Sequence, residues 1–142
     1  MENKISKSFI GGITGTLVMT AVMMIAPKMG IPKMSPPAML SMMMGLPIIV
    51  GWFMHFMIGI IFALIYAFFF FNILKKINNN LLKGAIFGLA SFIFAQIAIG
   101  IMDAMIGGMP AMEGSMILMM IGSIMGHVIF GMVVTQFVKE SK

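Results

Sequence analysis

The sequence predicts an all-α, polytopic membrane protein with four transmembrane helices arranged as two similar hairpins. Hydrophobic residues make up 61% of the 142 positions, against roughly 45–50% in a soluble domain. Charged residues make up only 9%, against about 25% in a soluble domain. A compact soluble protein of this length has too much surface for its volume to hide so many apolar side chains. This composition excludes a soluble enzyme and a disordered chain, and we treat residues 1–142 as a single transmembrane domain.

The helices follow from stretches that contain no charged residue. About 20 residues, at 1.5 Å each, cross the ~30 Å hydrocarbon layer of a bilayer. The charge-free stretch 34–74 is long enough for two crossings, but Pro36, Pro37 and Pro47 interrupt its first part. A break exposed to lipid would leave backbone groups unpaired. We therefore predict helices over residues 8–26, 48–72, 82–106 and 115–138.

Residues 35–45, between the first two predicted spans, carry the signals of a short helix. Ser35 stands at the N-cap position, prolines follow in the first turn, and Gly45 stands at the end. We expect this apolar helix to lie on the outer face of the membrane before the second span. The alternative interpretation of the same residues is an irregular loop.

Lysine placement predicts the orientation of the chain. The nine basic residues are all lysines, and the net charge is +5. With four alternating spans, Lys28 and Lys33 fall on one side of the membrane and the other seven lysines on the opposite side. The positive-inside rule then predicts that both termini are cytoplasmic. Nucleic-acid binding is not predicted, because no basic patch with interleaved aromatic residues is present.

The chain nearly matches itself at a spacing of 72 or 73 residues, which indicates an internal duplication of residues 1–72 in residues 73–142. Both repeats would cross the membrane in the same direction, so a pseudo-two-fold axis would lie along the membrane normal. The only two histidines of the chain would then lie at similar depth. The matching segments are Gly11-x-x-x-Gly15 with Gly84-x-x-x-Gly88, Pro37-Ala38-Met39 with Pro110-Ala111-Met112, and His55-x-x-x-Gly59 with His127-x-x-x-Gly131.

Glycines spaced four residues apart predict close helix packing. Small residues at this spacing let two backbones approach each other inside a bilayer, where no hydrophobic force drives helices together. Gly59 and Gly131 also follow the two histidines by one turn and would leave space beside each ring. The glycines that we assign to packing are Gly11, Gly15, Gly59, Gly84, Gly88, Gly122, Gly126 and Gly131.

His55 and His127 are the candidate functional residues, because a polar ring inside a bilayer is costly unless it finds a partner. Three uses remain open. The two imidazoles could ligate a metal or a haem iron, or relay protons with water or Tyr66. They could instead make only structural hydrogen bonds. The neighbouring polar side chains that we expect around them are Tyr66, Gln96, Thr16 and Thr20.

Methionine occupies 21 positions, and thioethers are soft ligands that suit Cu(I). Met39 and Met112 lie in the two equivalent outer segments, so we group them with His55 and His127 as candidate metal ligands. The competing interpretation is that methionine is flexible apolar filler. Haem fits less well than copper, because its propionates favour cationic partners and the outer side has only two lysines.

Two acidic residues, Asp103 and Glu113, bracket the second outer turn and would attract cations to its mouth. The alternative for Glu113 is a favourable interaction with the dipole of the following helix. No nucleophile with a base, phosphate-binding loop or carboxylate pair is present, so the sequence does not predict an enzyme.

Several motifs resemble known families. His55 followed by Tyr66, then Lys83-Gly84-Ala85 and Gly126-His127, resembles the YagU-like inner-membrane proteins. The segment Gly15-Thr16-x-x-Met19-Thr20, with Pro27, Gly30 and Pro32 after it, resembles a related family of small uncharacterised bacterial proteins with four helices. The resemblance implies a protein of the bacterial inner membrane with two histidines on its helices. It implies no biochemical activity.

We therefore expect a small membrane protein that binds or passes a cation, either a metal ion or a proton, through a polar centre at His55 and His127. The alternative is a non-catalytic accessory or assembly subunit that packs against larger membrane proteins or against copies of itself. Small size and small-residue helix faces favour this alternative.

Overall fold

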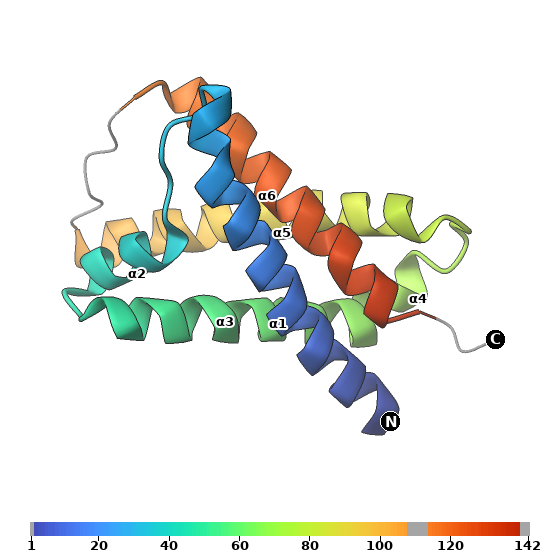
Figure 1. Ribbon diagram of the computed structural model, residues 1–142. Helices are drawn as coiled ribbons and strands as arrows, with labels where there is room; N and C mark the ends of the chain where they lie inside the picture. The colour runs from blue at the N-terminus through green and yellow to red at the C-terminus, as the bar shows by residue number, and fades with distance from the viewer. Residues whose placement is uncertain (1, 108–113, 140–142) are drawn as a thin grey trace.

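The computed structural model describes residues 2–107 and 114–139, and the regular structure of these residues is entirely helical (Figure 1). Within them, four helices are long and apolar enough to cross a membrane: Asn3–Met29, Ile48–Ile73, Asn80–Ile106 and Met116–Phe137. The predicted spans are confirmed, with ends that differ by a few residues. The chain is therefore a multi-pass membrane protein.

The first span consists of α1 (Glu2–Ile25) and a short 3-10 helix, η1 (Ala26–Met29). The helix begins six residues before the predicted start, because helical structure continues past the apolar segment through Lys4 and Lys7. It ends at Gly30, whose φ of 85° lies in the left-handed region that glycine adopts without strain.

A short helix, α2 (Pro36–Met44), occupies the segment for which the sequence predicts one. Ser35 stands at its N-cap position but makes no side-chain capping hydrogen bond, and Gly45 ends it with a φ of 62°. The helix packs on the first half of α3 (Ile48–Ile65). Gly51 makes this possible, since a methyl group at that position would overlap the carbonyl oxygen of Pro37.

The second span continues from α3 through a π-helical turn, η2 (Tyr66–Phe70), into α4 (Phe71–Ile73). Its buried residues in α3 are Gly51, His55, Gly59 and Ala63. They are spaced four apart and therefore share one face of the helix. This face carries His55 and packs against the neighbouring helices of the bundle.

The third and fourth spans are α5 (Asn80–Ile106) and α6 (Met116–Phe137), which pack closely against each other. The Asn79 side-chain oxygen caps α5 by accepting hydrogen bonds from the backbone amides of Leu81 (2.9 Å) and Leu82 (3.2 Å). The Thr135 hydroxyl donates to the carbonyl oxygen of Asn80 (2.9 Å) and connects the end of α6 to the start of α5.

Helices α1 and α6 run side by side in opposite directions and cross α3 and α5 (Figure 1). Helix α1 contacts α3 and α6, and α6 also contacts α5. The start of α1, the end of α6 and the connection from α4 to α5 lie at one end of the bundle, and α2 lies at the other. We call the first end the lysine-rich end; it carries Lys4, Lys7, Lys75, Lys76, Lys83 and Lys139.

The interior of the bundle is built from methionine and aromatic side chains. Met19 and Met23 of α1 lie in one cluster with Tyr66, Phe87 and Phe130. The Tyr66 and Phe87 rings are 4.9 Å apart between centroids. Many large apolar side chains are exposed instead, as expected where helices face lipid rather than water.

Candidate functional site

The contact between α1 and α3 is a close approach of two backbones. A Cβ atom at Gly12 would lie 2.7 Å from the Cα atom of Ile60 and 2.9 Å from the carbonyl oxygen of Gly59. A methyl group at Gly59 would overlap the hydroxyl of Thr16. The first helix pair therefore meets through Gly12 and Thr16 on one side and Gly59 on the other.

The contact between α5 and α6 repeats this arrangement 72 positions later. A Cβ atom at Gly84 would lie 2.7 Å from the carbonyl oxygen of Gly131 and would overlap the Cα atom of Met132. A methyl group at Gly88 would overlap the carbonyl oxygen of His127. Gly84, Gly88 and Gly131 thus take the places of Gly12, Thr16 and Gly59.

The glycines of α1 that the sequence aligns with Gly84 and Gly88 have a different neighbour. Gly11 faces Phe137 (3.2 Å from an added Cβ to the Phe137 Cβ atom), and Gly15 faces Phe130 (2.9 Å to its ring). Both therefore pack against α6 rather than α3. A spacing of 73 aligns Gly84 and Gly88 with glycines that lie on a different face of α1 from the one that meets α3. Residues with matching contacts are 72 positions apart.

His55 is buried and makes a hydrogen bond to a neighbouring span. Its Nε2 atom lies 3.1 Å from the Thr20 hydroxyl oxygen, which itself donates to the carbonyl oxygen of Thr16 (2.7 Å). A hydroxyl has one proton to give, so both bonds are satisfied when Nε2 carries the imidazole proton and donates to Thr20. In the neutral ring, Nδ1 then keeps its lone pair.

His127 is half-buried and is held within its own helix. Its Nδ1 atom lies 2.8 Å from the carbonyl oxygen of Ser123. A carbonyl only accepts, so Nδ1 carries the proton and Nε2 keeps the lone pair in the neutral ring. The neighbouring ring is Phe92, whose centroid lies 5.8 Å from that of His127. Phe92 follows Thr20 by 72 positions, so a phenyl ring replaces the hydroxyl that faces the first histidine.

His55 lies on α3 and His127 on α6, and both of these helices pack against α1. Each imidazole has one ring nitrogen fixed by a hydrogen bond and one, His55 Nδ1 or His127 Nε2, without a hydrogen-bond partner among residues 2–107 and 114–139. A nitrogen lone pair can accept a proton or coordinate a metal ion. The hydrogen bond at the other nitrogen fixes the orientation of the ring, as second-shell bonds do for metal-ligating histidines.

Two methionines that the sequence does not single out as ligands, Met19 and Met23, pack against the glycine that precedes His127. The Met23 sulfur is 3.1 Å from the position of an added Cβ atom at Gly126, and Met19 is 3.4 Å from it. Both side chains are buried, and Gly126 directly precedes His127. The signal in the sequence is their place on α1, since Met19 adjoins Thr20 and Met23 follows it by one turn.

The remaining predicted residues lie elsewhere. Tyr66 is buried in the aromatic cluster, eleven residues from His55 and therefore about 16 Å away along the helix. Gln96 is exposed on α5, Met39 is half-buried on α2, and Asp103 lies near the end of α5. Gly122 faces the Met34 side chain. Met112 and Glu113, with the matching segment 110–112, lie outside the described residues.

No group of three or more His, Cys, Asp or Glu side chains that could hold a metal ion occurs in the part of the chain that the structure describes. Any metal at the histidine pair would therefore need a further ligand of another kind. The neighbouring thioethers are ligands of that kind for a soft metal ion.

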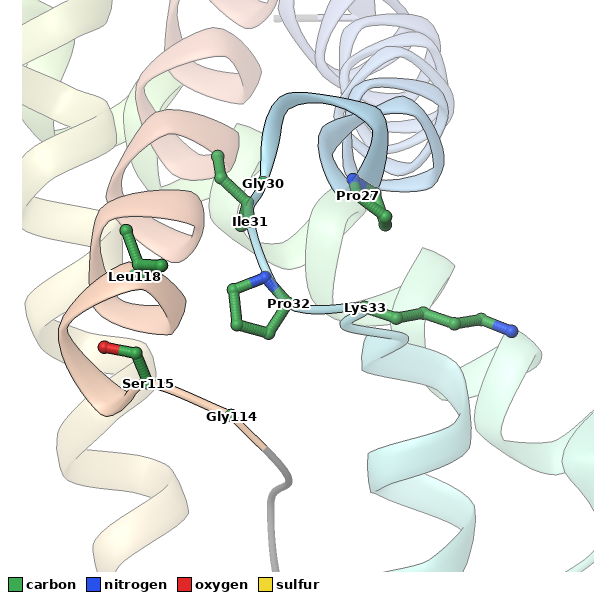
Figure 2. A pocket seen from close by; sticks show the side chains of 8 residues that line it. All are labelled: Pro27, Gly30, Ile31, Pro32, Lys33, Gly114, Ser115 and Leu118. Atoms are coloured by element: carbon green, nitrogen blue, oxygen red, sulfur yellow. The ribbon is translucent and has the colours of Figure 1, made fainter.

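A hollow of about 730 Å³ opens at the α2 end of the bundle. It lies between the segment after η1 and the start of α6, and it is lined in part by Pro32, Ser115 and Leu118 (Figure 2). The Lys33 side chain extends away from Ser115 and Leu118. The hollow is lined by proline, glycine and aliphatic residues with one serine and one lysine.

Comparison with known proteins adds a family assignment without an activity. No curated protein and no solved structure matches the sequence. One family model does match, over residues 2–141, and it is described as a family of unknown function, DUF6789. Since the match covers nearly the whole chain, the protein belongs to the DUF6789 family.

Proposed function

We propose that the protein binds or passes a cation at the pair formed by His55 and His127. The observation that carries this proposal is the pair itself: two imidazoles on separate spans, each with one nitrogen fixed and the other open. The matching contacts around them at a spacing of 72 support an origin by internal duplication. Two histidines on equivalent spans of two repeats would place a polar centre at the interface between the repeats.

Of the possible cations, the two imidazoles favour a proton. The lone pair of a neutral imidazole can take up and release a proton, and it needs no further ligand to do so. Buried hydroxyl and carbonyl groups of Thr16 and Thr20 extend the polar path on the side of His55. An enzyme is not proposed, because the Thr20 hydroxyl beside His55 donates its proton to the carbonyl oxygen of Thr16 and accepts from the ring, so the ring does not act as its base.

The test is proton flux in vesicles that contain the purified protein and a trapped pH-sensitive dye, with an imposed potassium diffusion potential. The double variant His55→Gln, His127→Asn keeps an N–H donor at the place of each fixed nitrogen but removes both open nitrogens. We expect its flux to fall to that of empty vesicles. Tyr66→Phe is the control, because Tyr66 lies outside the pair, and it should retain the flux. Undiminished flux in the folded double variant would refute the proposal.

A soft metal ion is the second candidate, and the buried thioethers of Met19 and Met23 favour it. Two imidazoles and two thioethers are a ligand set that suits Cu(I). Elemental analysis and visible absorption of the purified, reduced protein distinguish the candidates. Stoichiometric copper that is lost in Met19→Leu, Met23→Leu supports the metal, and a Soret band would indicate haem. If copper is at background level and proton flux is present, the proton is the cation that the pair carries.

The alternative from a different class is an accessory or assembly subunit. Its support lies on α5, where no residue from Phe92 to Ile106 is buried and Gln96 is exposed in the middle of the span. A polar amide facing lipid is costly, and a second membrane protein or another copy of this chain would cover it. Native mass spectrometry after extraction in mild detergent tests this role. A lone, stable monomer would argue against it.

The proposal also includes the orientation of the protein in the membrane and the membrane in which it lies. The concentration of lysines at one end of the bundle supports cytoplasmic termini through the positive-inside rule. The resemblance to the YagU-like proteins supports the bacterial inner membrane.

A further inference from the structure

Lys83, in the first turn of α5, is a largely buried lysine. Its side chain is only 8% exposed, although it carries a positive charge at the edge of a membrane span. Among the side chains that the structure describes, those of residues 3–107 and 114–139, none forms an ion pair with it. Lysines are almost never so fully buried unless they are paired.

A second lysine approaches the same aromatic ring. The Lys4 Nζ atom lies 4.6 Å from the centroid of the Phe71 ring, and the Lys83 Nζ atom lies 5.9 Å from it. The residues come from α1, α4 and α5, so the start of α1 meets the connection between the second and third spans here. One ring attracts two ammonium groups but does not neutralise them, and the two like charges repel each other. An anion placed between them would remove this repulsion.

The position of the two lysines indicates which anion fits. Asp103, the one acidic residue whose side chain the structure describes, lies twenty residues from Lys83 on the same helix, about 30 Å away, so it does not pair with Lys83. Lys4 lies near the start of the first candidate span and Lys83 near the start of the third, and the ends of spans are where lipid headgroups are expected. Exposed apolar side chains flank them on both helices, including Ile5 (51% exposed) and Leu82 (51%). Such a surface accepts acyl chains directly below a headgroup.

We propose that Lys4 and Lys83, which both approach the Phe71 ring, bind the phosphate of an anionic phospholipid headgroup. Basic pockets between transmembrane helices bind such headgroups in other membrane proteins. The acyl chains would lie along the exposed faces of α1 and α5, and the phosphate would accept hydrogen bonds from both ammonium groups. This inference is independent of the histidine pair.

The test is titration of the detergent-solubilised protein with phosphatidylglycerol or phosphatidylcholine, with bound lipids counted by native mass spectrometry. Lys4→Met and Lys83→Met should each weaken phosphatidylglycerol binding about five-fold, and Lys83→Arg should keep it. Lys28→Met and Lys33→Met remove the same charge at the other end and should leave it unchanged. Circular dichroism checks that each variant is helical.

Three results would overturn the proposal. One is equal affinity of the wild type and the folded Lys4→Met, Lys83→Met variant for phosphatidylglycerol. Another is equal affinity of the wild type for the two lipids. The third is release of the lipid by excess inorganic phosphate, which would assign the site to free phosphate. Lipid that stays bound in excess phosphate supports the headgroup together with its acyl chains.

Discussion

The two helix pairs meet through backbone contacts at the same relative positions, but they differ in what surrounds the histidine. In the pair α1 and α3, the ring of His55 is buried and bonded to Thr20 on the neighbouring span. In the pair α5 and α6, the ring of His127 is half-buried, bonded within its own helix and flanked by Phe92. The difference shows that one backbone arrangement holds two imidazoles in different chemical environments.

The pairs also differ in how well they are covered at the α2 end. Helix α2 packs on the first half of α3 through Gly51. The second half of α5 has no buried residue beyond Ser91. The covered pair is therefore suited to fix a histidine, and the uncovered pair leaves a helix face open to lipid or to another protein.

The largest expected effect concerns the glycines at the two crossings. Gly88→Ala forces a methyl group into the backbone of His127 and should destabilise the fold by about 3 kcal/mol. Gly59→Ala meets the movable side chain of Thr16 and should cost about 1 kcal/mol. Unfolding in detergent measures both. Equal costs would show that the two crossings are equally tight.

A smaller effect is expected at the hydrogen bond that distinguishes the two histidines. Thr20→Val keeps the shape of the side chain but removes the acceptor for His55, and it should cost about 1 kcal/mol. Thr14→Val on the same helix is the matched control, since no hydrogen bond of the Thr14 side chain is described. If both variants lose the same stability, the bond to His55 contributes nothing and the two histidine environments are energetically alike.

The smallest effect is expected on the uncovered face of α5. A methyl group at Gly100 meets no atom within 4 Å, so Gly100→Ala should be neutral or stabilise the helix by about 0.5 kcal/mol. Measured in the same unfolding assay, a clear destabilisation would instead mean that another chain packs against this face. Gly88 and Gly100 lie on the same helix, so the difference between the two stability changes separates the effect of crowding at the added methyl group from that of helix propensity.

Much of the fold was predictable because its signals are local. Charge-free stretches fix the four spans, and Pro36, Pro37 and Gly45 mark the short helix before the second span. The pairing of glycines with helices was less accessible, because Gly11 and Gly12 are neighbours in sequence but face different helices. A self-match of the sequence does not state which face of a helix meets which partner.

The sequence by itself determined that this chain crosses a membrane four times and carries two histidines inside it, because hydropathy and helix length are properties of contiguous residues. Only the tertiary structure decided which groups meet those histidines. Thr20 reaches His55, and Phe92 reaches His127, through the crossing of helices. Met19 and Met23 reach Gly126, and Lys4 reaches Phe71, in the same way. Such contacts depend on crossing angles and helix rotation, which are set by packing across the whole bundle.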